Sequence, residues 1–137
     1  MFSFTNFFKS VKSITILAII LGLWTTGLLT ASGFEATVNI VTNSSSSNGG
    51  AYFDPSSLNI YYGTIITWKN NDSVVHSVVS GVPGSEYSGV DFNSGSIEPG
   101  GTFQHTANSV GILDYYCKLH PFMTGYALVI GNKSVIG

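Results

Sequence analysis

The sequence contains no arginine and only five basic residues, all lysines, among its 137 residues. Three of them, Lys69, Lys118 and Lys133, lie after residue 33, where seven acidic residues outnumber them. A nucleic-acid surface needs clustered positive charge, and the sequence has no such cluster. The acidic residues are scattered along the chain, so we predict an ordinary solvated surface and no nucleic-acid partner.

Cysteine is nearly absent too, since Cys117 is the single one. A disulfide within the chain is therefore impossible, and a lone cysteine in an exported chain needs an explanation. Cys117 is either a small buried apolar residue or a metal ligand or reactive thiol. Composition favours the first interpretation, and the residues around Cys117 favour the second.

The long apolar run of the sequence lies at the amino terminus. Lys9 and Lys12 end a short basic head, residues 14–29 are almost entirely apolar, and small residues follow at positions 31–33. This order is typical of a secretory signal. About 16 apolar residues exceed most signal cores but fall short of the roughly 20 that span a membrane, so an anchor that associates with the membrane through residues 14–31 is the alternative. Both interpretations place the rest of the chain outside the cytoplasm, in a periplasm, a pseudo-periplasm or at the cell surface.

We therefore expect three segments: a signal or anchor over residues 1–33, an amino-terminal strand with a flexible Ser/Asn/Gly-rich segment over residues 34–50, and a domain over residues 51–137. The roughly one hundred residues after the signal suit a single domain. We expect the protein to be a monomer.

Short segments rich in β-branched and aromatic residues alternate with turn residues, and none has the period of an amphipathic helix. The predicted strands cover residues 36–42, 58–62, 64–69, 77–80, 102–106, 112–117 and 126–130. Six or seven strands in about one hundred residues indicate an all-β sandwich or small barrel. Alternation along the strand 112–117 predicts that Cys117 points inward, whereas Tyr116 faces solvent together with Asp114.

Cys117, His120 and Met123 follow one another with two residues between each pair. Thiolate, imidazole and thioether groups suit copper, and a blue copper site needs a second histidine beside them. His76 begins a predicted strand directly after a turn, where its side chain can meet another loop. His105 lies in the middle of a predicted strand, so we expect a structural role for it and choose His76 as the ligand.

These residues and their surroundings resemble the plastocyanin/amicyanin type of cupredoxin, a family of type 1 blue copper proteins. The resemblance covers roughly residues 51–130 and includes residues 53–72, His76 with its two successors, residues 91–103, and residues 115–125 with the short ligand loop of amicyanin. Two positions depart from the family. Ser77 stands where an asparagine usually ties the two ligand loops together, and Leu119 stands where amicyanin has a proline.

The resemblance implies a Greek-key β-sandwich of the cupredoxin type that holds one type 1 copper ion through His76, Cys117, His120 and Met123. It implies a one-electron carrier rather than an enzyme. Its extracytoplasmic redox partners are expected to dock near the His120 edge, and the outward Tyr116 resembles the tyrosine of a second electron port. Leu119 keeps an N–H that proline lacks, and this N–H could reach the Cys117 sulfur.

Two other classes of protein stay open at this stage. A copper-binding carrier or storage protein without an electron-transfer role would bind the same metal, although such sites are usually richer in methionine or histidine. A metal-free adhesive β-sandwich would accommodate the glycosylation sequons at Asn43, Asn71 and Asn132. Intense visible absorption from a Cu(II)–thiolate bond distinguishes the electron carrier from both.

Overall fold

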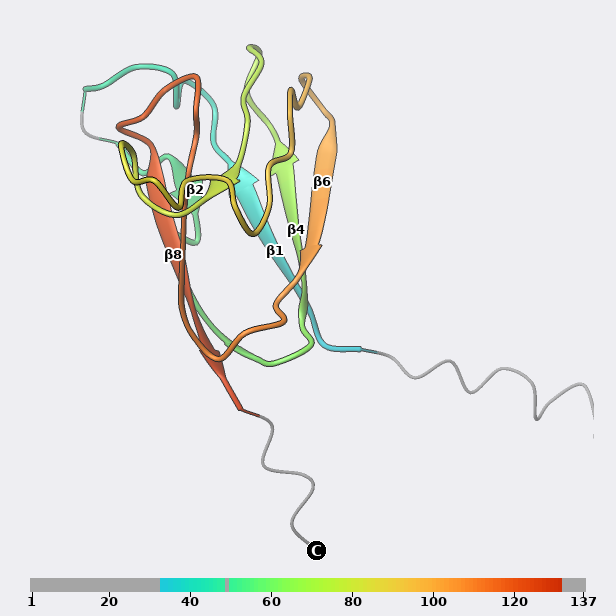
Figure 1. Ribbon diagram of the computed structural model, residues 1–137. Helices are drawn as coiled ribbons and strands as arrows, with labels where there is room; N and C mark the ends of the chain where they lie inside the picture. Colours follow the sequence, from blue (N-terminus) through green and yellow to red (C-terminus); the bar gives the residue numbers. More distant parts are fainter. Residues whose placement is uncertain (1–32, 49, 132–137) are drawn as a thin grey trace, which may run out of the picture. The chain divides into compact units, whose positions relative to one another are not determined.

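Eight strands form two four-stranded sheets that face each other (Figure 1) in this computed structural model, which describes residues 33–48 and 50–131. The strands are β1 (Glu35–Ile40), β2 (Phe53–Asp54), β3 (Ser57–Tyr61), β4 (Ile65–Asn70), β5 (Val79–Ser80), β6 (Thr102–Thr106), β7 (Gly111–Tyr116) and β8 (Thr124–Ile130). The strand order is β2-β1-β4-β6 in one sheet and β3-β8-β7-β5 in the other. The predicted all-β sandwich is confirmed.

Both sheets are mixed. The pairs β1–β4 and β3–β8 are parallel, whereas β1–β2, β4–β6, β5–β7 and β7–β8 are antiparallel. Parallel neighbours need long crossover connections, and here these crossovers bring segments that are distant in the sequence to the same end of the sandwich. The loops after β4 and β7 both lie at the end opposite to the one where β1 begins and β8 ends (Figure 1).

The core fills the space between the sheets and is centred on Trp68. Alternation along β4 buries Ile66 and Trp68 and leaves Lys69 exposed, because successive side chains of a strand point to opposite faces. The ring of Trp68 lies 5.1 Å from that of Tyr115, centroid to centroid, and 5.3 Å from that of Phe92. Burial of each large apolar side chain stabilises the fold by about 1.5–3 kcal/mol, so this core gives the loops above it a rigid base.

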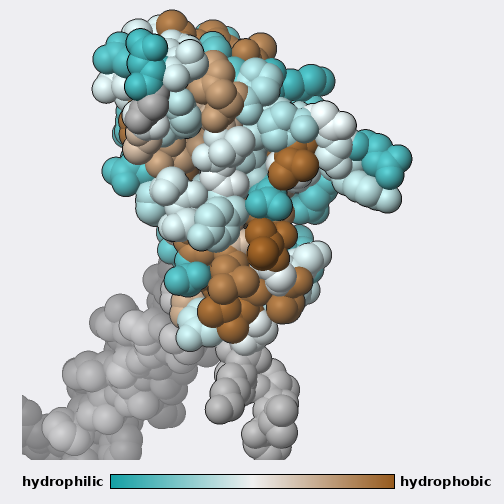
Figure 2. Space-filling model, turned by 90° about the vertical axis from the view of Figure 1, so that its left-hand side faces the viewer, coloured by the Kyte–Doolittle hydropathy of each residue, from teal (hydrophilic) through white to brown (hydrophobic). Residues whose placement is uncertain are grey.

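The outward side of β8 remains apolar. Tyr126, Leu128 and Ile130 alternate with buried neighbours and are between 39% and 46% exposed. The space-filling view shows apolar groups at both ends of the sandwich on this side of the molecule (Figure 2).

Three predictions about elements need correction or stay open. The predicted strand 77–80 is shortened to β5, and β2 was not predicted. The segment 43–50, predicted as a flexible loop or spacer, begins with a turn in which Ser44 is buried. The predicted signal or anchor lies outside the described residues except for Gly33, so it and the segment boundaries drawn from it stay predictions.

In the described part of the chain, residues 33–48 and 50–131, no helix has the length and apolar character that crossing a bilayer requires.

Candidate metal centre

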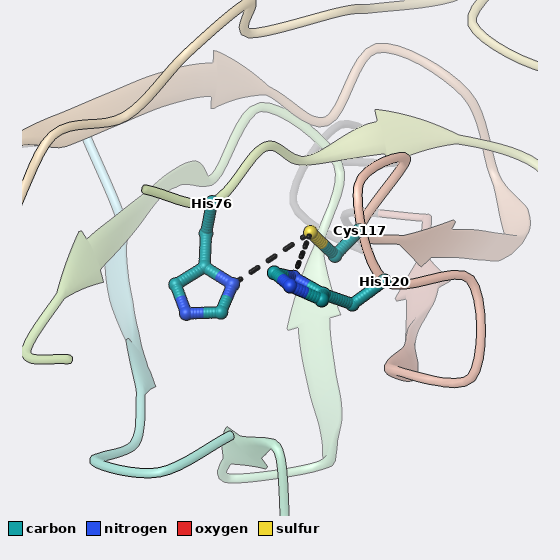
Figure 3. A group of neighbouring side chains, drawn as sticks. All are labelled: His76, Cys117 and His120. Carbon is teal, nitrogen blue, oxygen red and sulfur yellow. Dashed lines mark hydrogen bonds between the residues drawn. The ribbon is translucent and has the colours of Figure 1, made fainter. Parts of the chain in front are cut away.

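Two histidine rings converge on the sulfur of Cys117 at one end of the sandwich (Figure 3). Cys117 Sγ lies 3.7 Å from His76 Nδ1 and 3.6 Å from His120 Nδ1. The ligand atoms of the three residues all lie within 4.8 Å of one another. This separation is small enough for all three to bind a single metal ion.

The loop from Cys117 to Met123 closes on itself through backbone hydrogen bonds. Cys117 N–H donates to Met123 O at 3.0 Å, and Met123 N–H donates to His120 O at 2.9 Å. His120 N–H donates in turn to Cys117 O at 3.2 Å. Because β7 ends at Tyr116 and β8 begins at Thr124, the sheet holds both ends of this loop. The Met123 side chain is fully buried within the core cluster.

Ser77 links the two ligand segments. Its backbone N–H lies 3.4 Å from Cys117 Sγ, its Oγ lies 3.8 Å from the same sulfur, and that Oγ accepts the N–H of Lys118 at 3.0 Å. Serine thus ties the loops at the position where the family usually has asparagine. Among the described residues, no hydrogen bond joins Leu119 N–H to the sulfur; Ser77 makes the backbone N–H contact to Cys117 Sγ, and Leu119 is 54% exposed.

The far nitrogen of the His76 ring is held by a buried carboxylate. His76 Nε2 lies 2.9 Å from Asp72 Oδ2 and 3.2 Å from Ser44 Oγ. Asp72 also accepts the Ser44 hydroxyl at 3.2 Å and the backbone N–H groups of Asn43 and Ser73 at 3.0 Å and 2.8 Å. Burial by itself raises the pKa of this carboxyl group, but the hydrogen bonds from the His76 ring, two backbone N–H groups and a serine hydroxyl outweigh it and hold the pKa of Asp72 well below its usual range.

Sequence reasoning missed both Asp72 and Ser44. The spacing of Asp72, four positions before His76, was the available signal, because it brings an acidic side chain back toward the ring across one turn. Ser44 belongs to a distant segment and gave no signal in the sequence.

His120 has different surroundings, since its ring is partly exposed. Partial burial and the nearby His76 lower the pKa of His120, and the charge of Asp72 opposes this shift. The residues beside it are apolar: Leu119 is 54% exposed, and Phe122 is 39% exposed with its ring 6.0 Å from that of His120.

His105 lies apart from this cluster. It belongs to β6, where its Nε2 is 3.3 Å from Asp91 Oδ2 and its ring lies tilted against that of Phe92, with the centroids 4.5 Å apart. The structure thus gives His105 a packing environment and brings His76, rather than His105, to the cysteine.

The expectation that Tyr116 faces solvent is wrong. Tyr116 is 5% exposed, and its hydroxyl forms a hydrogen bond with Ser88 Oγ. Tyr116 does point away from the core that holds Tyr115, but β5 pairs with β7 at Val79 and the turn that follows covers this outer face. An exposed electron port at Tyr116 is therefore not available.

A β-sandwich of two mixed sheets with a cysteine and two histidines gathered at one end defines a cupredoxin. The chain belongs to the plastocyanin/azurin family of copper binding proteins, whose sequence profile matches residues 36–130. The thiol and the two imidazole nitrogens are donors that copper prefers, so the cluster could bind one copper ion.

Individual relatives agree with this assignment. Halocyanin of Natronomonas pharaonis is 33% identical over 93 residues, which are 66% of this chain and 55% of halocyanin, so the chain spans about half of that relative. Plastocyanin A/B of Petroselinum crispum is 32% identical over 82 residues, which are 55% of this chain and 81% of that plastocyanin.

Solved structures match as well. A purple cupredoxin from Nitrosopumilus maritimus superposes with a TM-score of 0.65 at 32% identity, over 69% of this chain and 99% of that one. A mutant of amicyanin in its Cu(I) form gives a TM-score of 0.54 at 23% identity, over 74% and 87% of the two chains, which shows the common fold.

Proposed function

We propose that this protein is a type 1 blue copper protein that carries single electrons between extracytoplasmic redox partners, and that it is not an enzyme. The observation that carries the proposal is the convergence of Cys117 Sγ, His76 Nδ1 and His120 Nδ1 within 4.8 Å. A reactive thiol or a copper store needs no such pair of imidazoles aimed at one sulfur.

Under this proposal, His76, Cys117 and His120 hold the copper ion, and Met123 is the fourth ligand. Copper, when bound, supplies the one-electron Cu(II)/Cu(I) couple. The chain contributes rigidity, because the ligand loop is closed by its own backbone bonds and tied to His76 through Ser77. A site that moves little between oxidation states has little structure to reorganise when the electron moves.

The partly exposed His120 edge is the proposed place of electron exchange. Leu119 and Phe122 surround it with exposed apolar groups. A small apolar surface suits brief contacts with redox proteins, because such encounters bury little area.

The proposed location is outside the cytoplasm. The support is the basic head followed by the apolar residues 14–29 in the sequence, an order typical of a secretory signal. Amino-terminal sequencing of the native protein tests it: a mature chain that starts near residue 34 indicates a cleaved signal, and a retained segment indicates a membrane anchor.

The visible spectrum of the copper-loaded protein tests the proposed function. The expected result is an intense visible band from Cu(II)–thiolate charge transfer that disappears in Cys117→Ser while the circular dichroism of the sandwich is unchanged. His76→Ala should lose or alter the band, whereas His105→Ala should keep it. A colourless protein that takes up only Cu(I) would contradict electron transfer and favour a storage role.

A further inference from the structure

The two nitrogens of the His76 ring have sharply different neighbours. Nδ1 faces Cys117 Sγ at 3.7 Å, whereas Nε2 faces Asp72 Oδ2 at 2.9 Å. The His76 side chain has no exposed surface and that of Asp72 is 3% exposed. Solvent therefore does not compete for these contacts, and the protein itself decides which nitrogen carries the proton.

Both carboxylate oxygens of Asp72 accept hydrogen bonds, as the donors around them show. The backbone N–H groups of Asn43 and Ser73 can only donate, so Oδ1 must accept. Oδ2 accepts the Ser44 hydroxyl and faces His76 Nε2. Nε2 is then the nitrogen that carries the proton, and Nδ1 keeps the lone pair that a metal needs.

We propose that Asp72 is a positioning residue for the copper site. Asp72 holds the His76 ring in its Nε2–H tautomer, and its buried negative charge favours Cu(II) over Cu(I). The inference rests on the proposed ligation of copper through His76 Nδ1. A carboxylate bonded to the outer nitrogen of a ligating imidazole orients the ring and raises its basicity. A fixed negative charge stabilises the more highly charged oxidation state.

The segment 43–48 helps to hold the Asp72 carboxylate in place. It supplies two of the donors to Asp72, the N–H of Asn43 and the hydroxyl of Ser44. Ser44 is 2% exposed, so this polar segment closes the buried side of the site. His120 has no equivalent support, because no carboxylate within residues 33–48 and 50–131 makes an ion pair with its ring. The two histidines are therefore inequivalent, because of the two only His76 is paired with a carboxylate.

The variant Asp72→Asn tests the inference, because asparagine has nearly the same shape as aspartate but no charge. The new amide has one oxygen, which the two backbone donors require, so its NH₂ group turns toward His76 Nε2. That contact favours the Nδ1–H tautomer, which has no lone pair for copper. We expect the Cu(II) affinity to fall by about 10–100-fold and the Cu(I) affinity to fall less. Each tenfold difference between the two losses raises the reduction potential by about 59 mV.

The matched control is Asp91→Asn. Asp91 is the other carboxylate that faces a histidine in the described chain, with Oδ2 at 3.3 Å from His105 Nε2, and His105 is not in the ligand cluster. This control removes one negative charge beside a histidine outside the ligand cluster, from a side chain that is 50% exposed, whereas that of Asp72 is 3% exposed. Its potential and Cu(II) affinity should stay close to those of the parent protein.

Nitrogen-15 NMR of the copper-free parent protein, with its imidazoles neutral, reads the tautomer without any substitution. The expected spectrum shows a proton on His76 Nε2 that exchanges slowly with water. A proton on Nδ1 instead would overturn the inference even if Asp72→Asn failed to fold. A folded Asp72→Asn protein with an unchanged potential, or with the same shift as Asp91→Asn, would overturn it too. A parent protein without the blue band would instead refute the proposed function, so the two failures are distinguishable.

Discussion

Ser77 places two polar groups beside the Cys117 sulfur. Its Oγ accepts the N–H of Lys118, so its own hydroxyl proton is free to point toward the sulfur 3.8 Å away. The backbone N–H of Ser77 approaches the same sulfur at 3.4 Å. Hydrogen bonds to a ligating thiolate withdraw charge from it and favour the reduced metal.

The variant Ser77→Ala should therefore lower the reduction potential. It removes the hydroxyl but keeps the backbone N–H, so the sulfur loses one of two donors. It also leaves the N–H of Lys118 without its acceptor, which costs about 1–3 kcal/mol of stability if the group stays buried. Voltammetry and urea unfolding measure the two effects. Ser77→Thr, which keeps the hydroxyl, is the control, and an equal potential in both variants would contradict the account.

Met123 offers a second prediction at this scale. Its side chain is fully buried in the same core cluster as Cys117. If Met123 is the proposed fourth ligand, Met123→Gln replaces a soft sulfur with a harder oxygen that favours Cu(II). The reduction potential should fall, by about 59 mV for each tenfold gain in relative Cu(II) affinity. An unchanged or higher potential in voltammetry would show that Met123 is not a copper ligand.

At the scale of elements, the pair β7–β8 carries the ligand loop and depends on one close contact. Tyr115 and Gly125 are partners in the ladder. A Cβ at position 125 would lie 2.6 Å from Tyr115 Cε2 and 2.8 Å from its hydroxyl oxygen. The Tyr115 ring cannot retreat, because it packs at 5.1 Å against the rings of both Phe53 and Trp68.

The variant Gly125→Ala should destabilise the fold by about 1–3 kcal/mol, the usual cost of an overpacked core. Thermal and urea unfolding of the copper-free protein measure the loss. Gly50→Ala is the matched control, because a Cβ there meets nothing within 4 Å, and it should change stability by less than about 0.5 kcal/mol. Similar stabilities for the two variants would show that the Tyr115 ring can move.

At the scale of the whole molecule, the buried Tyr115 makes the stability of the fold depend on pH in the alkaline range. Burial raises the pKa of Tyr115 from 10.0 to about 12. The folded state therefore favours the neutral phenol, whereas the unfolded chain ionises from about pH 10 upward. The stabilisation is fully present below pH 10 and is lost as the pH rises toward 12.

The free energy of unfolding should consequently fall by about 1.4 kcal/mol per pH unit in that range because of Tyr115. Urea unfolding of the copper-free protein between about pH 9 and pH 11.5 measures the slope. Tyr115→Phe keeps the ring in the core and should make the slope shallower. Parallel pH profiles for the two proteins would show that Tyr115 ionises without unfolding.

The sequence by itself determined the strands and the composition of the site. Period-two alternation and turn residues predicted most strand positions, because side chains that alternate between core and solvent leave that pattern in the sequence. The short spacing of Cys117, His120 and Met123 placed a thiol, an imidazole and a thioether on one loop, and this combination indicated the types of metal donor. The predicted position of His76 directly before a strand, rather than within one like His105, pointed to the fourth candidate, although β5 begins only at Val79.

The tertiary structure decided what lies around these residues. The bonds of Ser44 to Asp72 and to His76 join residues that are 28 and 32 positions apart, and the parallel pairing of β1 with β4 brings their segments together. Tyr116 is buried because a turn from another part of the chain covers a face that alternation alone assigns to solvent. Ser77, rather than Leu119, contacts the sulfur because two loops meet at the end of the sandwich. Local patterns record which side of a strand is apolar, but contacts between distant segments depend on how the sheets are joined.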